Sequence, residues 1–231
     1  MIYLTGDTHG EFHHVIDFCH KMQTNQDDII VILGDVGLNY YGGKRDRLQK
    51  EQLGALNTTF FCIHGNHEKR PANIASYQTT VWHGGKVYAE EAHPNLIFAM
   101  DGEIYDLNGF QTIVIGGAYS VDKYRRLQNH WSWWPDEQPS EEIKKKVENQ
   151  LAARGWNIDI VLSHTTPLKY EPVEAFLPMV DQSTVDRSTE IWLDTIEDRL
   201  AYRHWYCGHY HIEKSIDNLT IMFQSFREFP S

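Results

Sequence analysis

Five short segments of the chain each place metal-binding side chains directly after an apolar run. They are Asp7-Thr8-His9, Gly34-Asp35, Gly65-Asn66-His67-Glu68, Ser163-His164 and Gly208-His209-Tyr210-His211. Carboxylate, amide and imidazole groups form the ligand mixture that a pair of divalent metal ions would use. One such segment would mean little, but five of the same form point to a hydrolytic enzyme.

Uninterrupted apolar runs predict the strands that must carry these segments. The runs are Ile2–Leu4, Ile29–Leu33, Phe60–Ile63, Leu96–Met100, Thr112–Ile115, Ile158–Leu162, Leu219–Phe223 and a short one at Trp205–Cys207. Between the first two runs, apolar residues recur at helical spacing from Phe12 to Met22, and Arg47–Leu56 offers a second helix. Alternating strands and helices are typical of stacked βαβ units.

The middle of the chain has a different pattern. Asp101-Gly102 and Asn108-Gly109 each separate short alternating runs, which predicts hairpins and an antiparallel meander over residues 94–117. Asp217-Asn218 predicts a third hairpin turn. Two more helices are expected, one from Ser140 to about Gly155 and one over Thr189–Tyr202. We find no linker, internal repeat or low-complexity tract, so we expect one domain over residues 1–231.

Ligands of open α/β sheets collect beyond the carboxyl ends of the strands. If the strands above share an edge, seven candidate ligands converge on one rim. They are Asp7, His9, Asp35, Asn66, His164, His209 and His211. Flanking glycines support this arrangement, because the backbone must turn sharply or approach an ion closely there. These glycines are Gly6, Gly10, Gly34, Gly65 and Gly208.

These motifs, in this order over almost the whole chain, resemble the calcineurin-like metallophosphoesterase superfamily, whose members are binuclear metal phosphoesterases. The resemblance implies an α/β (α+β) fold, a two-sheet β-sandwich of mixed sheets flanked by helices in four αββα layers. It also implies that two metal ions share Asp35. The first site would comprise Asp7, His9, Asp35 and His211, and the second Asp35, Asn66, His164 and His209.

By the same resemblance, the chain would hydrolyse phosphodiesters or small phosphomonoesters with a hydroxide that both metals activate. His67 would act as general acid or charge stabiliser at the leaving-group oxygen, beside the bridging Asp35. The ligands suit two divalent, or mixed-valence, ions of Mn, Fe or Zn better than Ca, without selecting among them. The expected partner is a phosphate ester.

The second motif departs from the protein-phosphatase branch of the family. That branch resembles Gly-Asp-x-x-Asp-Arg-Gly, whereas Leu38 and Asn39 stand here at the second Asp and the Arg. The arginine that grips phosphate in that branch is therefore missing, which argues against a protein phosphatase. A nuclease of the same fold and a non-catalytic metal-binding scaffold remain as alternatives.

Residues 119–139 are the least regular part of the chain and carry both cations and tryptophans. Arg125 and Arg126, with Lys123, either contact the substrate phosphate beside Asn66 or form a solvated basic loop. Trp131, Trp133 and Trp134 either line a pocket or pack in a core or subunit contact. Glu68 is either an acceptor behind a metal-bound group or a solvated charge.

Composition limits the remaining possibilities. The net charge of −11 argues against extended duplex nucleic acid and anionic membranes as partners. No apolar run approaches the roughly 20 residues that span a bilayer. The N-terminus is expected to be a strand and not a signal peptide, so a cytoplasmic location follows by default.

Three cysteines without a Cys-x-x-Cys pair are expected to be buried thiols. Nothing in the sequence indicates an oligomeric state.

Overall fold

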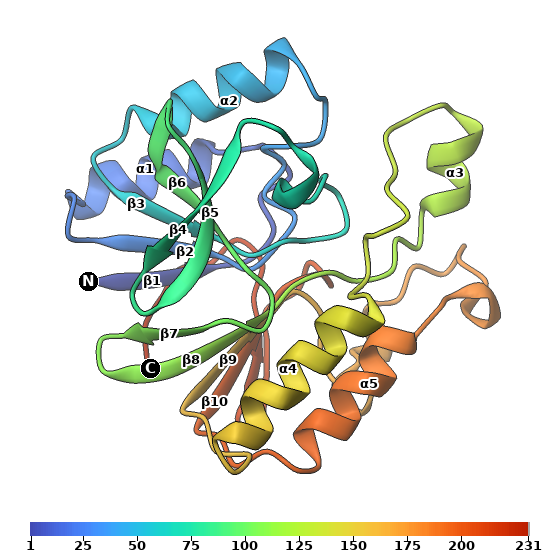
Figure 1. Ribbon diagram of the computed structural model, residues 1–231. Coiled ribbons are helices and arrows are strands. Elements are labelled where there is room, and N and C mark those ends of the chain that lie inside the picture. Colours follow the sequence, from blue (N-terminus) through green and yellow to red (C-terminus); the bar gives the residue numbers. More distant parts are fainter. Residues whose placement is uncertain (231) are drawn as a thin grey trace.

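A computed structural model describes residues 1–230, which fold around two β-sheets (Figure 1). The first sheet contains, in spatial order, β13 (Arg227–Glu228), β1 (Ile2–Thr5), β2 (Ile29–Ile32), β3 (Thr59–Cys62), β6 (His93–Ala99), β5 (Gly85–Glu90) and β4 (Tyr77–Trp82). The second contains β11 (Lys214–Ile216), β12 (Leu219–Ile221), β10 (His204–Cys207), β9 (Ile160–Ser163), β8 (Phe110–Ile115) and β7 (Ile104–Leu107). Parallel strands form the centre of each sheet, and antiparallel strands flank them.

Helices cover the outer face of each sheet. The longer ones are α1 (His13–Met22), α2 (Lys44–Gly54), α4 (Glu141–Ala153) and α5 (Ser188–Glu197), and the short α3 (Lys123–Gln128) projects from one end. Single 3₁₀ turns cover Pro71–Asn73, Leu168–Tyr170, Val173–Ala175 and Gln182–Thr184.

The predicted start of α4 is confirmed, since the Ser140 hydroxyl accepts a hydrogen bond from the Ile143 N–H at 3.3 Å. Such a serine cap satisfies a backbone N–H that the first turn leaves without a partner. Within residues 1–230, none of the helices has the length and hydropathy needed to cross a bilayer.

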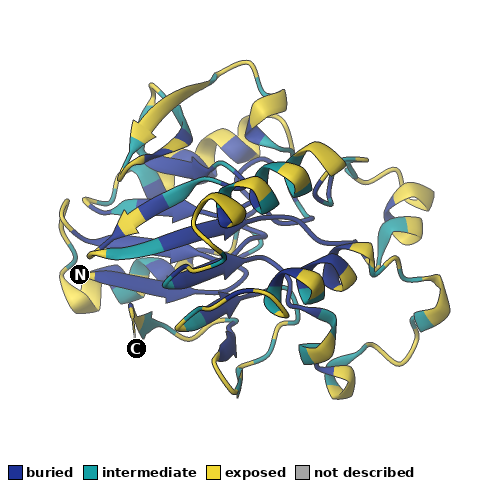
Figure 2. Ribbon diagram, turned by 60° about the horizontal axis from the view of Figure 1, so that its bottom comes forward, coloured by how far each residue is buried: buried dark blue, intermediate teal, exposed yellow. Residues whose placement is uncertain are grey.

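Three hydrophobic clusters fill the spaces between four layers. Successive strand residues point to opposite faces of a sheet, so Val31 packs between the two sheets while its neighbour Ile30 packs toward α1. A third cluster joins the second sheet to α4 and α5, where Val161 of β9 packs with Val147. Figure 2 shows the central strands buried throughout. This αββα arrangement of two mixed sheets is the predicted fold, and it is confirmed.

Two of the three expected hairpins form, and one does not. Asn108 and Gly109 join β7 to β8 with φ angles of 52° and 83°, as this two-residue turn requires. Asp217 lies in the turn between β11 and β12. The prediction at Asp101-Gly102 was wrong: the chain turns there, but β6 and β7 lie in different sheets. Antiparallel hairpin pairing within residues 94–117 is thus limited to β7 and β8. Packing between the two sheets, and not the turn itself, decides which sheet the strand after Gly102 joins.

Other differences concern segments without a strong local pattern. The hairpin of β4 and β5 was not predicted, since β4 is mostly exposed and its turn, His83-Gly84, is an uncommon turn pair. Helix α3 was also missed, and α2 and α5 end before the predicted ends at Leu56 and Tyr202. The three cysteines are buried free thiols, as expected.

Candidate metal centre

The parallel strands place the five motifs at one rim of the sandwich. Strands β1, β2 and β3 lie side by side in the first sheet, and β9 and β10 are neighbours in the second. Each strand ends one to four residues before the first candidate ligand of its motif, so ligands from both sheets meet beyond the carboxyl ends. The strand order therefore explains why the candidate ligands lie near one another. The sequence alone does not give this strand order.

The backbone is constrained at four of the seven candidate ligands. His9, Asp35, His209 and His211 have φ angles of 48°, 45°, 72° and 52°. These angles lie in the left-handed region, which residues with a Cβ atom rarely adopt. Such conformations persist only where the surroundings hold them, and they gather at functional sites. The packing around these loops therefore holds strained backbone conformations that orient the four side chains.

Two glycines allow the loops to approach the carboxylates. A Cβ atom on Gly65 would lie 2.1 Å from both the backbone nitrogen and Oδ1 of Asp35, and one on Gly208 would lie 2.3 Å from Oδ1 of Asp7. These separations are far below van der Waals contact. Any other residue at either position would displace a buried carboxylate.

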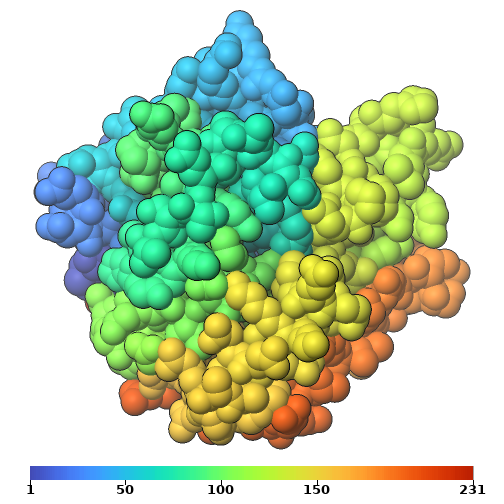
Figure 3. Space-filling model, viewed as in Figure 1, coloured from blue at the N-terminus to red at the C-terminus, as the bar shows by residue number. Residues whose placement is uncertain are grey.

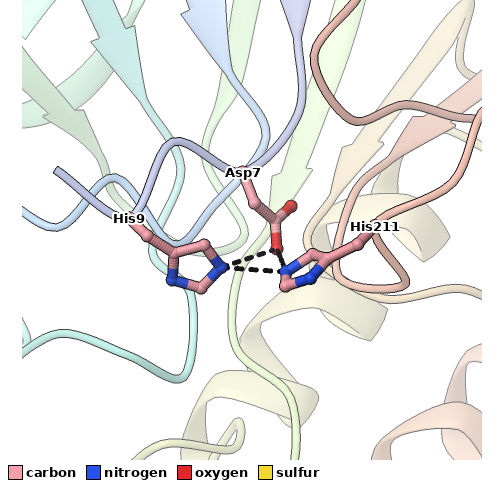
Figure 4. Close-up of side chains that lie close together, drawn as sticks. All are labelled: Asp7, His9 and His211. Atoms are coloured by element: carbon pink, nitrogen blue, oxygen red, sulfur yellow. Dashed lines mark hydrogen bonds and ion pairs between the residues drawn. The ribbon is translucent and has the colours of Figure 1, made fainter. Parts of the chain in front are cut away.

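Asp7, His9 and His211 form the first group of candidate ligands (Figure 4). Their side chains point toward one another, although residues 9 and 211 lie at opposite ends of the chain. The Nε2 atoms of the two histidines are 2.8 Å apart, and His211 Nε2 lies 3.2 Å from Asp7 Oδ2. The other oxygen of Asp7 accepts the backbone N–H of His209 at 2.8 Å, which fixes the orientation of the carboxylate.

Asp35 joins this group to a second one. Its Oδ2 lies 3.8 Å from His9 Nε2, and its Oδ1 lies 3.5 Å from His164 Nε2. The same His164 nitrogen is 2.9 Å from Asn66 Oδ1, and His164 Nδ1 is 2.9 Å from the Leu33 carbonyl. The centre of the His209 ring lies 5.0 Å from that of His164. Asp35 is thus the carboxylate that lies between the two sets of ligands.

Charges in this rim and burial favour the ligand forms of Asp35 and His209. Burial raises the pKa of Asp35, but the nearby histidines, His164 foremost, hold it well below its usual range. Burial and the neighbouring His164 lower the pKa of His209 to about 3. At neutral pH the carboxylate is therefore ionised and the imidazole of His209 is neutral, and these are the states that bind metal.

The donor atoms fit metal ions. Within each of three groups, all ligand atoms lie within 4.8 Å of one another: Asp7, His9 and His211; His9, Asp35 and His67; and Asp7, Asp35 and His164. Asp7 Oδ2 is buried and accepts no hydrogen bond within residues 1–230, and the Nε2 atoms of His211 and His9 lie 3.2 Å and 3.8 Å from it. A buried, ionised oxygen that accepts no hydrogen bond is costly, and a bound cation would remove that cost.

His67 lies beside this centre and lines a cavity next to it. Its backbone N–H donates to Asp35 Oδ1 at 2.7 Å, and its Nε2 lies 3.5 Å from Asp122 Oδ1. Burial lowers the pKa of His67, but Asp35 and Asp122 outweigh that effect and raise it. No sequence pattern marked Asp122, because it comes from residues 119–139 and meets His67 only in the fold.

A buried network fixes the orientation of Asn66. Its side-chain N–H donates to Ser120 Oγ at 3.0 Å, which leaves the amide oxygen toward His164. The Ser120 hydroxyl in turn donates to Glu137 at 2.6 Å and accepts from Arg126 at 2.9 Å. Ser120 and Glu137 were missed by the sequence reasoning, since neither lies near a motif.

Arg125 and Arg126 do not line the cavity. Arg126 is fully buried and donates to the backbone carbonyl of Ser132 as well as to Ser120. Arg125 places its guanidinium 5.7 Å from the ring centre of exposed Trp131. The structure therefore gives Arg126 a role in holding residues 119–139 together. Its Nη1 also donates to the backbone carbonyl of Asn66 at 3.5 Å, but its guanidinium does not line the cavity.

Glu68 is not a solvated charge, and it belongs to none of the three ligand groups. It is fully buried and accepts the backbone N–H groups of Gly37 at 3.1 Å and Gly65 at 3.0 Å. Burial, reinforced by the charge of Asp35, raises its pKa to about 8. Glu68 thus ties the loop after β2 to the loop after β3.

Comparisons with known proteins agree with the fold and the motifs. The family model described as calcineurin-like phosphoesterase matches residues 1–213. No curated protein sequence matches the chain significantly. TT1561 of Thermus thermophilus is similar in structure, with 12% identity, a TM-score of 0.52, and coverage of 96% of this chain and 87% of that one, which shows the fold alone. The phosphopantetheinyl hydrolase PptH from Mycobacterium tuberculosis is more distant in structure, with 16% identity, a TM-score of 0.43, and coverage of 96% and 87%.

Proposed function

The chain belongs to the calcineurin-like phosphoesterase family, and we propose that it hydrolyses phosphodiesters or small phosphomonoesters at a centre of two divalent metal ions. One ion would be held by Asp7, His9, Asp35 and His211, and the other by Asp35, Asn66, His164 and His209. The observation that supports the proposal is that these seven side chains lie together beyond five strand ends of two sheets, with Asp35 3.8 Å from His9 Nε2 and 3.5 Å from His164 Nε2.

Two ions of Mn, Fe or Zn would supply a nucleophile derived from water at neutral pH and would offset charge on the phosphoryl oxygens. The side chains of the protein would position the substrate and donate a proton to it. His67, with its raised pKa and its partner Asp122, would donate a proton to the leaving-group oxygen. Asn66, held by Ser120, would keep its amide oxygen toward the centre.

The surroundings of the second motif support a substrate other than a phosphoprotein. Leu38 is fully buried, and the Asn39 side chain donates to the Tyr77 hydroxyl at 3.2 Å. Neither side chain could bind a phosphate through charged hydrogen bonds as an arginine would. Phosphate binding in this chain would therefore depend on the metals, His67 and Asn66.

Hydrolysis of p-nitrophenyl phosphate and bis-p-nitrophenyl phosphate tests the proposal. We expect protein stripped with a chelator to be inactive and to recover activity with Mn, Fe or Zn, but not with Ca, which prefers ligand sets made only of oxygen. Release of p-nitrophenol measures the rate. No stimulation of either substrate by any of the three metals would contradict the proposal and favour a non-catalytic scaffold.

A further inference from the structure

A cavity of about 530 Å³ extends from the metal rim along residues 171–187. This segment and the α3 segment project from the same end of the molecule (Figure 1) and form neighbouring lobes on its surface (Figure 3). Five of the lining residues that this segment supplies are apolar: Ala175, Phe176, Leu177, Val180 and Val185. A phosphate at the metals would therefore place the organic part of its ester against apolar side chains.

This cavity has no free cation for a second phosphate. Arg187 is the only lysine or arginine that lines it among residues 1–230. Its Nε donates to both oxygens of Glu171, at 3.2 and 3.1 Å, and its other nitrogens donate to Gln182. The charge of Arg187 is thus already compensated, and its side chain is committed to holding the segment.

Glu190 contributes an uncompensated acid to the same cavity. It lies in the first turn of α5, is only 3% exposed, and accepts from the Thr165 hydroxyl at 2.8 Å through Oε1. Its Oε2 is buried and has no hydrogen-bond partner in the described chain. Burial, with a smaller contribution from Glu171 and Asp186, raises the pKa of Glu190 to about 7. A carboxyl group in this position would be stabilised by a cationic ligand.

An aromatic ring lies close to this acid. The Thr165 hydroxyl, from which Glu190 accepts, is 3.1 Å from the Tyr210 hydroxyl. The ring of Phe176 is nearly parallel to that of Tyr210, at 19°, with centres 6.4 Å apart, and the Arg187 guanidinium already lies 5.6 Å from the centre of the Phe176 ring. An aromatic face beside a carboxylate can recognise an ammonium group, and Tyr210 offers such a face here.

We propose that this cavity binds the organic group of the substrate and selects esters in which that group is apolar and carries an ammonium, which Glu190 neutralises. The proposal rests on the proposed function, since the phosphate is taken to lie at the metals. The substrate class is a phosphate ester of an apolar amino alcohol or an aminoalkyl phenol. Esters with further phosphates are disfavoured, because four carboxylates and one compensated arginine line the cavity beyond the rim: Asp122, Glu171, Asp186, Glu190 and Arg187.

A pair of matched esters tests this selection in the wild-type protein. The two are 4-(aminomethyl)phenyl phosphate and 4-(hydroxymethyl)phenyl phosphate, which have the same shape and differ in one positive charge. We expect kcat/KM to be about tenfold higher for the amine, as one desolvated charge contact would give. Equal kcat/KM values for two esters that are both hydrolysed would overturn the proposal without any variant being needed.

Two variants then test whether Glu190 causes the preference for the amine. Glu190→Gln keeps the shape and the acceptor for Thr165 but removes the charge, so the preference for the amine should fall to within about twofold. Glu174→Gln is the matched control, because Glu174 lies in the same segment but is exposed, pairs with Lys214 and does not line the cavity. The control should keep the full preference. A preference that survives Glu190→Gln would overturn the role of Glu190.

Binding without turnover separates this proposal from the proposed function. Calorimetric titration with benzylamine and with neutral benzyl alcohol measures recognition of the charge alone. Tighter binding of benzylamine, lost in Glu190→Gln, would support the cavity's role even if neither ester were hydrolysed, and in that case only the proposed function would fail. Equal binding of the two ligands would contradict the cavity's role even in an active enzyme.

Discussion

Asp35→Asn is expected to lower metal-dependent turnover by roughly 10³-fold, about 4 kcal/mol of transition-state stabilisation. Asparagine keeps the shape of the side chain and can still accept the His67 N–H, which lies 2.7 Å from Oδ1. It removes the negative charge that lies 3.8 Å from His9 Nε2 and 3.5 Å from His164 Nε2. The loss should thus come from the metal centre and not from the fold.

Steady-state hydrolysis of p-nitrophenyl phosphate at saturating Mn measures this effect. Asp28→Asn is a suitable control, because Asp28 is a buried carboxylate at the opposite end of the sheet, where it accepts from the N-terminal amine. The control should keep wild-type turnover, and a thermal melt should show both variants folded. If Asp35→Asn retained more than about a tenth of the wild-type rate, Asp35 would not be the shared ligand.

His67→Gln is expected to lower kcat by about 10²–10³-fold while the bound metal stays unchanged, which is the usual scale for removing a general acid. Glutamine fills similar space but cannot supply a proton to the leaving oxygen. The loss should be greater for phenyl phosphate than for p-nitrophenyl phosphate, because a poorer leaving group depends more on protonation.

Comparing these two substrates, together with metal analysis, distinguishes the possible roles of His67. The centre of its ring lies 5.2 Å from that of His9, and its donor atom is close enough to those of His9 and Asp35 for it to be a ligand. A ligand role would appear as lost metal, and a purely structural role as an equal loss for both leaving groups. Either result would contradict a general acid. His20→Gln, at an exposed position on α1, should change neither quantity.

The candidate ligands could be predicted from the sequence because each follows its strand within a few residues. An apolar run that ends in Gly-Asp or Gly-His is a local pattern, and parallel strands bring such ends together. The residues that support the ligands have no such signal. Ser120 lies 54 positions from Asn66, and Asp122 is similarly far from His67, so only the packed structure relates them.

The same limit applies to the fold and to the cavity. Gly102 was recognised as a turn residue, and its φ of 74° agrees, but the sheet that the next strand joins depends on packing. Glu190 reads in the sequence as an ordinary acid in the first turn of a helix. Its burial against Thr165, 25 positions away, is what turns it into a candidate for substrate recognition.

We propose that seven side chains from both sheets bind two metal ions that share Asp35. The most direct test is the manganese content of purified protein, by elemental analysis after equilibration with Mn and removal of unbound ion. We expect two ions per wild-type chain and fewer in Asp35→Asn. One ion or none in the wild type, or two retained in Asp35→Asn, would contradict it.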